Sequence, residues 1–412
     1  MKTVDHANAL GAASTAAHIP HIRLPKAATR LLGLLTRLKI GTLTLHAPDG
    51  NHQVFGTHAA PFAALHIHRW EVCAEVLKSG DIGFAEGFMA GEWETPDLTT
   101  VLEAFSLNFD RLHELVEGNG VMRVFNALLH LFNRNDRKGS RKNIHAHYDL
   151  GNAFYSRWLD PSMTYSSALF ERPGQSLVEA QTAKYAALAR TLELRPEHHV
   201  LEIGCGWGGF AEFAAREVGA RVTAITISRA QHDFARQRMF EAGLAEKADI
   251  QLIDYRDVQG RFDRVASIEM FEAVGEEYWP TYFGKVHEVL VPGGRAGLQI
   301  ITIRDELFDH YKRTPDFIQK YIFPGGMLCP PGLFQDLART AGLKPANPTF
   351  YARDYADTLA AWHRNVLGVR EQIVKQFDER FLRMWRYYLS YCECGFRTGS
   401  IDLMHITLNK PA

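Results

Sequence analysis

Two glutamates, Glu269 and Glu272, stand three residues apart in the segment SIEMFEAVG (267–275), directly after the strand-like residues FDRVASI. Their neighbours are apolar, and burial among such neighbours raises the pKa of a carboxyl group toward neutrality. A carboxylate with a raised pKa is a candidate general base, which takes a proton from a reacting group. The pair therefore raises the question of whether either glutamate does chemistry, and on what substrate.

A glycine-rich loop offers a cofactor site in VLEIGCGWGGF (200–210), between a strand-like and a helix-like segment. Its spacing fits the G-x-G-x-x-G pattern of dinucleotide sites and, from Glu202 onward, the E-x-G-x-G-x-G pattern of methyltransferases. A nicotinamide cofactor would need an acid about 20 residues further on to hold the ribose hydroxyls. Residues 220–232 contain no acid, and the next strand ends in Thr226, followed by Gln231. The same gap departs from most S-adenosylmethionine enzymes, so spacing alone leaves the cofactor open.

The composition limits the classes of partner and compartment. A chain of 412 residues is expected to form two domains. The 46 basic and 47 acidic residues give a net charge of -1, which argues against a nucleic-acid partner attracted by a basic field. Five scattered cysteines point to a reduced, cytoplasmic compartment. No window approaches the roughly 18 apolar residues of a transmembrane helix.

The elements that must position these residues follow from the hydrophobic periodicity. From about residue 195, apolar strand-like segments alternate with helical ones, such as ARVTAITIS followed by AQHDFARQRMFEAGL. This alternation is typical of an α/β fold with an open, mostly parallel sheet and helices on both faces. In such a sheet, functional groups gather at the carboxyl ends of the strands.

Two segments, 24–40 and 121–142, are amphipathic with a basic side. Each alone reads equally well as a core helix, but the two together favour contact with anionic lipid, where each basic residue contributes on the order of 1 kcal/mol. We expect four parts along the chain: a mobile tail (1–22), a small α+β accessory domain (23–120) with a β-hairpin around residues 48–51, a basic amphipathic linker (121–145) and a larger α/β domain (146–412).

Seven sequence blocks together resemble those of a known family. They are HYDLGNAFYSRWLDPSMTYSSALF (147–170), VLEIGCGWGGF (200–210), TISRAQ (226–231), MFEAVG (270–275), KYIFPGGML (320–328), DYADTLAAW (354–362) and RYYLSYCECGFR (386–397). In this order they resemble the cyclopropane-fatty-acyl-phospholipid synthase family, which includes the mycolic acid cyclopropane synthases. The first domain looks like the accessory N-terminal domain of the longer bacterial members. The resemblance implies a Rossmann-like class I methyltransferase sheet in the larger domain.

The resemblance implies an enzyme that transfers the methyl group of S-adenosylmethionine to the cis double bond of an unsaturated phospholipid acyl chain. Attack by the alkene leaves a carbocation, and loss of a proton from the transferred methyl group closes a cyclopropane ring. Aromatic faces can stabilise such a cation by roughly 0.5–2 kcal/mol each. The implied enzyme is cytoplasmic and binds the membrane peripherally. A homodimer is a further expectation, and no metal is expected.

The resemblance also implies the residues of the site. The expected contacts of S-adenosylmethionine are Tyr165, Ser166, Glu202, Gly204, Cys205, Gly206, Trp207, Gly208, Thr226 and Gln231. In the family a bicarbonate ion beside the methyl group is the base, and its ligands fall on Ser167, Glu272, Gln299, Ile301 and Tyr355. Cys392 matches a family cysteine often regarded as active, although the mechanism above needs no thiolate.

Two of the five anion ligands differ from the family pattern, since Ser167 replaces a cysteine and Gln299 replaces a histidine. Glutamine can hydrogen-bond an anion, but it cannot carry a charge or shuttle a proton near neutral pH. Either a weaker anion site persists, or Glu272 itself is the base. Glu269 has no counterpart role in the family. It is either a solvated acid in a first helical turn or a neighbour that raises the pKa of Glu272.

Ring formation is the leading expectation, and three alternatives stay open. The exchanged anion ligands favour a methyltransferase that stops at a methylene- or methyl-branched acyl chain. The second alternative is a non-catalytic lipid-binding homologue, and the intact glycine loop argues against it. A methyltransferase of a small soluble molecule is the third, and the two basic amphipathic segments weigh against it.

Overall fold

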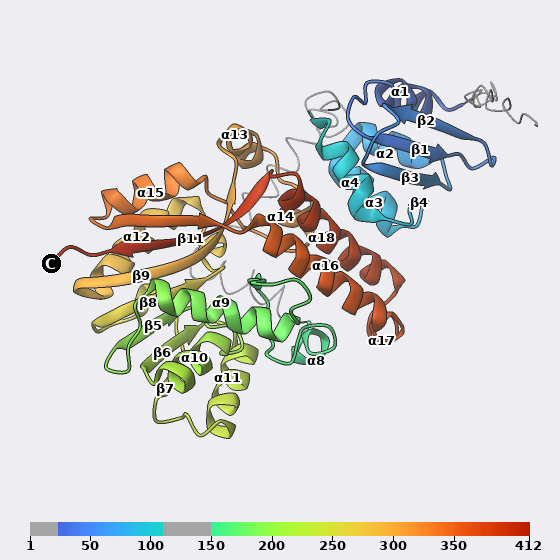
Figure 1. The fold of residues 1–412 in the computed structure, drawn as a ribbon. Helices are drawn as coiled ribbons and strands as arrows, with labels where there is room; N and C mark the ends of the chain where they lie inside the picture. Colours follow the sequence, from blue (N-terminus) through green and yellow to red (C-terminus); the bar gives the residue numbers. More distant parts are fainter. Residues whose placement is uncertain (1–23, 110–111, 113–149) are drawn as a thin grey trace, which may run out of the picture.

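The computed structural model describes residues 24–109, 112 and 150–412, so the predicted tail and basic linker lie outside the described residues. A small N-terminal domain and a larger α/β domain lie side by side (Figure 1).

The N-terminal domain has a four-stranded sheet in the order β2-β1-β3-β4, with helices packed on one face (Figure 1). The predicted hairpin is confirmed, because β1 and β2 pair antiparallel with His46 opposite His52. The parallel pairing of β1 with β3 was not anticipated from the sequence. The elements are α1 (Lys26–Leu35), β1 (Thr42–His46), β2 (His52–Gly56), β3 (Phe62–Ile67), α2 (Glu71–Ser79), α3 (Asp81–Met89), β4 (Trp93–Glu94) and α4 (Leu98–Ser106).

The amphipathic helix expected at 24–40 is shorter, and its apolar side is not available to a membrane. Helix α1 ends at Leu35, and Leu31, Leu35 and Leu38 are buried in the core of the N-terminal domain. This burial stabilises the domain, so the segment is a core helix. Among the helices that the structure describes, none is both long and apolar enough to cross a bilayer.

The larger domain is built on a seven-stranded sheet in the order β10-β11-β9-β8-β5-β6-β7. Strands β9, β8, β5, β6 and β7 are parallel, β11 runs antiparallel beside β9, and the edge strand β10 is antiparallel to β11. This is the predicted α/β fold with a Rossmann-like class I methyltransferase sheet. The strands are β5 (His199–Ile203), β6 (Arg221–Thr226), β7 (Ala248–Leu252), β8 (Phe262–Ile268), β9 (Leu290–Ile303), β10 (Lys344–Phe350) and β11 (Ile401–Asn409).

Helices cover both faces of this sheet, and each layer forms its own hydrophobic core (Figure 1). Helices α9, α10 and α11 pack around Val200 and Val222 on one face, and α12 and α15 pack around Val265 and Leu298 on the other. The helices are α8 (Asn152–Tyr155), α9 (Leu177–Thr191), α10 (Gly209–Phe213), α11 (Arg229–Glu241), α12 (Trp279–Val289), α13 (Asp305–Arg313), α14 (Phe317–Tyr321), α15 (Pro331–Thr340), α16 (Ala352–Gly368), α17 (Arg370–Gln376) and α18 (Glu379–Arg397), with a π-helical turn at Ala214–Val218 and 3-10 turns at Tyr255–Asp257, Phe271–Ala273 and Glu276–Tyr278.

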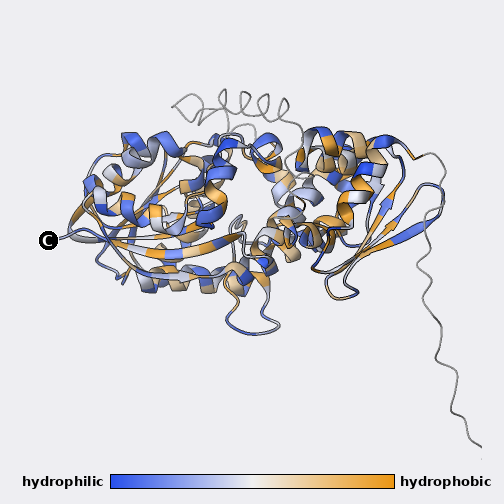
Figure 2. Cartoon of the chain, turned by 90° about the horizontal axis from the view of Figure 1, so that it is seen from above, coloured by the Kyte–Doolittle hydropathy of each residue, from blue (hydrophilic) through white to orange (hydrophobic). Residues whose placement is uncertain are grey.

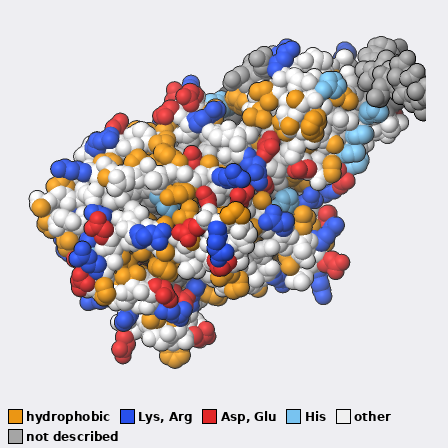
Figure 3. Space-filling view, in the orientation of Figure 1, with side chains coloured by type: hydrophobic (Ala, Val, Ile, Leu, Met, Phe, Trp, Pro, Cys, Tyr) orange, Lys and Arg blue, Asp and Glu red, His pale blue; other side chains and the backbone are white. Residues whose placement is uncertain are grey.

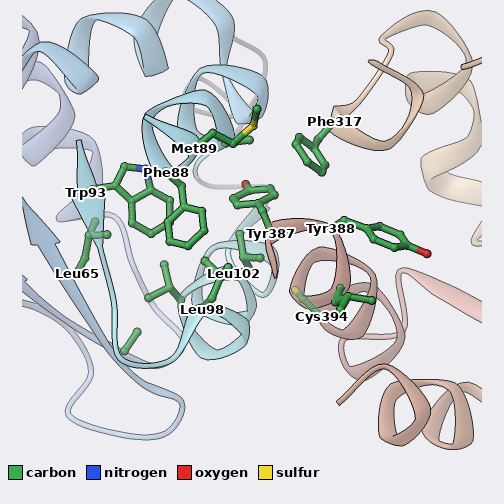
Figure 4. Packing of buried hydrophobic residues seen from close by; sticks show 14 of the residues in the cluster. Leu65, Phe88, Met89, Trp93, Leu98, Leu102, Phe317, Tyr387, Tyr388 and Cys394 are labelled. Atoms are coloured by element: carbon green, nitrogen blue, oxygen red, sulfur yellow. The ribbon is translucent and has the colours of Figure 1, made fainter. Parts of the chain in front are cut away.

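Helix α18 joins the two domains by packing against α3 and α4. The ring of Tyr387 lies 5.9 Å from that of Phe88, and Leu102 belongs to the same buried cluster (Figure 4). The hydroxyl of Thr99 donates a buried hydrogen bond of 3.1 Å to the carboxylate of Glu393. Hydrophobic residues run through the sheets and through the helices between the two domains (Figure 2). The interface is therefore a continuous core, which holds the domains in one relative position.

Two glycine substitutions test the helix packing of the N-terminal domain. A Cβ at Gly83 in α3 would lie 2.2 Å from the backbone oxygen of Glu75 in α2, whereas a Cβ at Gly33 in α1 meets no atom within 4 Å. We expect Gly83→Ala to lower the free energy of unfolding by about 1–3 kcal/mol. We expect Gly33→Ala to raise it by about 0.5–1 kcal/mol. Urea denaturation measures both, and a Gly83→Ala protein as stable as the parent would contradict the packing.

Candidate active site

A cavity of about 580 Å³ lies at the carboxyl ends of β5, β6 and β8. Strand β5 has β6 on one side and β8 on the other, which makes this edge a topological switch point, where open α/β sheets bind ligands. The glycine loop after β5 and the two glutamates after β8 both line the cavity. The volume lies within the usual range of small-molecule sites.

The glycine loop turns sharply between β5 and α10. Gly204, Gly206 and Gly208 have φ values of 83°, 51° and 82°, which residues with a side chain rarely adopt. A Cβ at Gly204 would lie 2.6 Å from Cγ of Met270, whereas one at Gly206 meets no atom within 4 Å. The loop backbone therefore faces open space at Gly206. Gly208 begins α10, and its nearest neighbour is Ala235 of α11.

The residues predicted to hold S-adenosylmethionine come together, and all of them except Gly208 line the cavity. Oε2 of Glu202 is buried without a hydrogen-bond partner in the described structure, and burial raises the pKa of this carboxyl to about 8. A buried carboxyl oxygen without a partner in the cofactor cleft can hydrogen-bond the amino group or a hydroxyl of S-adenosylmethionine. The residues present thus fit that cofactor. The lining residues among those predicted are Tyr165, Ser166, Glu202, Gly204, Cys205, Gly206, Trp207, Thr226 and Gln231.

Asp254 and Arg256 also line the cofactor end of the cavity, and sequence reasoning gave them no role. They follow β7, and the guanidinium of Arg256 donates to both carboxylate oxygens of Asp254 at 2.8 and 2.7 Å. An acid at the end of the strand-like segment ADIQLID was the signal that could have identified them.

The carboxylate of Glu269 is the centre of the site. Its Oε1 accepts hydrogen bonds from the backbone amide of Ser167 at 2.9 Å and from Nε2 of Gln299 at 2.7 Å. Its Oε2 accepts one from the hydroxyl of Tyr355 at 2.5 Å. Glu269 has a φ of 49°, a conformation that is rare for residues other than glycine. Such backbone conformations persist where the surroundings over-determine them, which is common at functional sites.

Gln299 is oriented toward Glu269 by a histidine that sequence reasoning did not single out. His405 lies opposite Gln299 in the β9–β11 pair, and its Nε2 lies 2.7 Å from the amide oxygen of Gln299. Burial lowers the pKa of His405 to about 4, so this ring is neutral near pH 7 and donates from Nε2. The amide oxygen of Gln299 is thereby occupied, which leaves its NH₂ group to donate to Glu269.

Glu272 lies next to this centre but has a different environment. Its Oε1 accepts from the backbone amide of Ile301 at 2.5 Å, and its Oε2 is buried with no partner in the described structure. Burial, together with the nearby charge of Glu269, raises the pKa of Glu272 to about 8. Glu272 is therefore mostly protonated near pH 7.

The structure brings the five predicted anion ligands together, but Ser167, Gln299 and Tyr355 bind Glu269, and Ile301 binds Glu272, which is the fifth. The backbone of Ser167 donates to Glu269, while its hydroxyl donates to the carbonyl of Ala168 at 2.9 Å. Of the two interpretations of Glu269, the solvated first-turn acid is wrong, because the residue is enclosed by protein and precedes the 3-10 turn. The other is supported, since Glu269 raises the pKa of Glu272.

A buried lysine completes the site, and sequence reasoning missed it. Nζ of Lys184 in α9 donates to the hydroxyl of Ser166 at 2.6 Å. Burial lowers the pKa of Lys184 to about 7, against the opposing charges of Glu269, Asp160 and Glu202. A lysine on the alanine-rich side of a helix was the available signal. The amino group of Lys184 therefore interacts electrostatically both with Glu202 at the cofactor end of the site and with Glu269 at the other end.

The cysteines of the site show no sign of activation. Cys392 in α18 lines the cavity, but burial raises the pKa of its thiol. Burial raises the pKa of Cys205 in the glycine loop in the same way. Both therefore stay protonated near neutral pH, and neither is a nucleophile there. In residues 24–109, 112 and 150–412 there is no group of three or more His, Cys, Asp or Glu side chains that could hold a metal ion.

Comparison with known proteins identifies the family to which a chain with this site belongs. The family model described as mycolic acid cyclopropane synthetase matches residues 135–406. The chain belongs to this family. It is 35% identical over 404 residues to tuberculostearic acid methyltransferase UfaA1 of Mycobacterium tuberculosis, covering 95% of this chain and 94% of the relative. It is 35% identical over 348 residues to the cyclopropane-fatty-acyl-phospholipid synthase of Escherichia coli K12, covering 81% of this chain and 85% of the relative.

A solved structure of a family member has the same fold. The mycolic acid cyclopropane synthase CmaA1, in complex with SAH and CTAB, matches with a TM-score of 0.62 and 30% sequence identity. The match covers 66% of this chain and 98% of CmaA1. The chain is thus a lipid-modifying, S-adenosylmethionine-dependent methyltransferase of this family.

The raised pKa of Glu272 predicts how stability depends on pH. The folded protein keeps this proton up to about pH 8, whereas an unfolded glutamate loses it near its ordinary value of 4.5. The contribution of Glu272 to stability is therefore complete below pH 4.5 and is lost as the pH rises toward 8, by up to about 1.4 kcal/mol per unit. Glu272→Gln removes this dependence. Denaturation midpoints across this pH range measure it, and parallel curves for parent and variant would contradict the assignment.

Replacement of Lys184 tests the electrostatic balance of the site. Lys184→Met leaves buried carboxylates without their cation, and we expect a loss of about 3–5 kcal/mol in the free energy of unfolding. Lys375→Met, which removes an exposed lysine of α17, is the matched control and should change little.

Adding Glu269→Gln to Lys184→Met should restore part of the lost stability, because it removes one of the uncompensated charges. Denaturation of the single and double variants measures this coupling. Strict additivity of the two changes would show that Lys184 and Glu269 do not interact.

Proposed function

We propose that this protein methylates the double bond of unsaturated phospholipid acyl chains and releases a methylene-branched chain in place of a cyclopropane ring. The observation that carries the proposal is the position of the Glu269 carboxylate. It accepts hydrogen bonds from Ser167, Gln299 and Tyr355, three of the groups expected to hold a bicarbonate ion. An internal carboxylate thus takes the place of the free anion.

When bound, S-adenosylmethionine supplies a methyl group to one alkene carbon, the bond between sulfur and that methyl breaks, and positive charge is left on the other alkene carbon. Tyr165, Trp207 and Tyr355 line the cavity, and their rings can stabilise this charge by roughly 0.5–2 kcal/mol each. Glu269 accepts the one proton that the alkylated chain must lose. The chain product, S-adenosylhomocysteine and this proton complete the balance.

The fixed position of Glu269 favours the branched product. Burial raises the pKa of Glu269, whereas the three donors that bind its carboxylate favour the ionised form and oppose that rise. A base held in place by three hydrogen bonds gives the cation time for a hydride shift from the methyl-bearing carbon to the neighbouring cationic carbon, which places the charge on the more substituted, methyl-bearing carbon. Loss of a proton from the methyl group then leaves a methylene branch on the chain. This outcome needs no reductant, whereas a saturated methyl branch would need one.

Glu272, which the sequence offered as an alternative base to bicarbonate, is less suited to that role. Its pKa of about 8 keeps it mostly protonated near neutral pH, and its Oε1 accepts from the amide of Ile301. A protonated carboxyl cannot accept the proton of the alkylated chain. We assign Glu272 to the wall of the site beside Glu269, where its neutral form avoids a second buried negative charge.

The names of the relatives support fatty acyl chains as the substrate class. They do not decide between a ring and a branch, so the proposal for the product rests on the geometry of the site. One relative is named for methylation of a fatty acid, and the other for cyclopropane formation on fatty acyl phospholipids, each at 35% identity. Acidic and basic side chains are interspersed on the face of the larger domain shown in Figure 3. Cytoplasmic location, peripheral binding to a membrane and a homodimer stay predictions.

Product analysis separates ring from branch. Purified protein is incubated with labelled S-adenosylmethionine and vesicles of a cis-unsaturated phospholipid, and the methylated chains are examined by NMR and by ozonolysis. We expect a methylene branch on the acyl chain, which ozone cleaves to a ketone. A cyclopropane ring, which resists ozone, would restore the leading expectation from the sequence. Absence of labelled lipid would favour a binding protein without activity.

Exchange of Glu269 tests its place in the anion site. Glu269→Gly removes the carboxylate and relieves the positive φ, so we expect a loss of methyl transfer of about 100-fold or more and partial rescue by added bicarbonate. Glu269→Gln is the matched control, because its amide fills the same space and bicarbonate should not rescue it. Equal rescue of both variants, or of neither, would argue against this assignment. The measurement is initial methyl transfer at increasing bicarbonate.

A further inference from the structure

The cavity that contains the catalytic site continues into the core of the N-terminal domain. Its lining includes Leu65 and Ile67 of β3, Val72 and Val76 of α2, and Leu102 of α4. All five are buried residues that belong to the same hydrophobic cluster as the interface helix α18. The methyltransferase site and this extension, which we call the N-terminal arm, therefore share one cavity.

The N-terminal arm is suited to hydrocarbon alone. Its lining from residues 31 to 112 contains no lysine, arginine, histidine or glutamate among the described residues. Within the described part of this lining, Asp81 and Ser106 alone contribute polar side chains. An ester, a phosphate or a head group placed in such surroundings would lose its water without gaining partners, at a cost of several kcal/mol. The methyl end of a lipid chain, which has no polar group, carries no such cost.

Two carboxyl groups face the cavity where the domains meet, and both are fixed to the wall. Asp81, at the start of α3, accepts from the amide of Ile82 at 2.8 Å. Asp316, before α14, accepts from the hydroxyl of Tyr391 at 3.2 Å and from the amide of Gln319 at 2.9 Å. Burial and the charge of Asp316 raise the pKa of Asp81 to about 7, so it is often uncharged near neutral pH. A hydrocarbon chain can pass such a group.

The arm is held in a fixed position relative to Glu269. Helix α18 lines the cavity through Tyr387, Tyr391 and Cys392, and the same helix packs on α3 and α4 of the N-terminal domain. The side chains of Arg383 and Glu94 form an ion pair across this interface, with Arg383 mostly buried. Because this connection is rigid, the length of the arm limits how long the substrate chain can be beyond Glu269.

We propose that the N-terminal arm holds the methyl end of the acyl chain whose double bond lies at Glu269, and so selects how far the double bond is from that end. This inference rests on the proposed function and names the part of the substrate that each domain binds. The polar end of the lipid must then leave the cavity from the larger domain, where Arg304 and His310 are among the lining residues. The N-terminal domain is thus a specificity element for the reaction.

Photo-crosslinking of the full-length protein tests the inference without any substitution. Vesicles of phosphatidylethanolamine and phosphatidylglycerol carry a small amount of a lipid with a cis double bond and a diazirine at the last carbon of the same chain. After illumination, we expect peptides from residues 62–79 and 98–109 to carry the lipid. Crosslinks confined to residues 150–412 would overturn the inference. Methyl transfer is measured separately on unmodified lipid, so its absence would count against the proposed function alone.

A matched pair of valine substitutions tests the selection of chain length. Val76→Phe in α2 fills the arm, whereas Val54→Phe in β2 is the matched control, because Val54 does not line the cavity and is 43% exposed. For chains that are long beyond the double bond, we expect kcat/KM of Val76→Phe to fall about tenfold or more, with about twofold change at most for shortened chains. Val54→Phe should match the parent on both. Equal loss on long and short chains in a folded Val76→Phe protein would contradict the inference.

Discussion

The structure depends on a carboxylate that is held inside the protein by three hydrogen-bond donors. The amide of Ser167, the side chain of Gln299 and the hydroxyl of Tyr355 converge on Glu269 from three separate elements. A buried carboxylate is costly unless its oxygens are satisfied, so these elements must meet with little freedom. The β9–β11 pair, helix α16 and the segment before α9 are positioned by this one group.

The charges around Glu269 explain why the site holds two carboxyl groups of different character. Lys184 and three donors act on Glu269, whereas Glu272 has one amide partner and a buried oxygen with none in the described structure. The low dielectric of the interior magnifies this difference, so that one proton is kept on Glu272 near pH 7. Burial raises the pKa of Glu269 as well, but Lys184 and the three donors oppose that rise, so Glu269 is the more readily ionised carboxyl of the pair.

Much of the fold and of the site could be predicted from the sequence, because the relevant signals are local. The alternation of strands and helices predicted the sheet, and the glycine loop predicted the cofactor end. The role of Glu269 could not be predicted in this way, because it depends on a positive φ and on donors more than 80 residues away in the chain, such as Tyr355. Lys184 and His405 were missed for a related reason, since each acts through a residue that it meets only in the folded chain. The basic segment at 24–40 shows the opposite error. Its local amphipathic pattern favoured contact with a membrane, but its apolar side is buried in the core.

The claim that an internal carboxylate replaces the free anion can be examined directly by crystallography. The decisive measurement is a crystal structure of the protein with S-adenosylhomocysteine, grown in the presence of bicarbonate. The account predicts the carboxylate of Glu269 within hydrogen-bonding distance of the Ser167 amide, the Gln299 side chain and the Tyr355 hydroxyl, with no separate ion between them. A bicarbonate ion bound to those three groups, with Glu269 turned away from them, would contradict it.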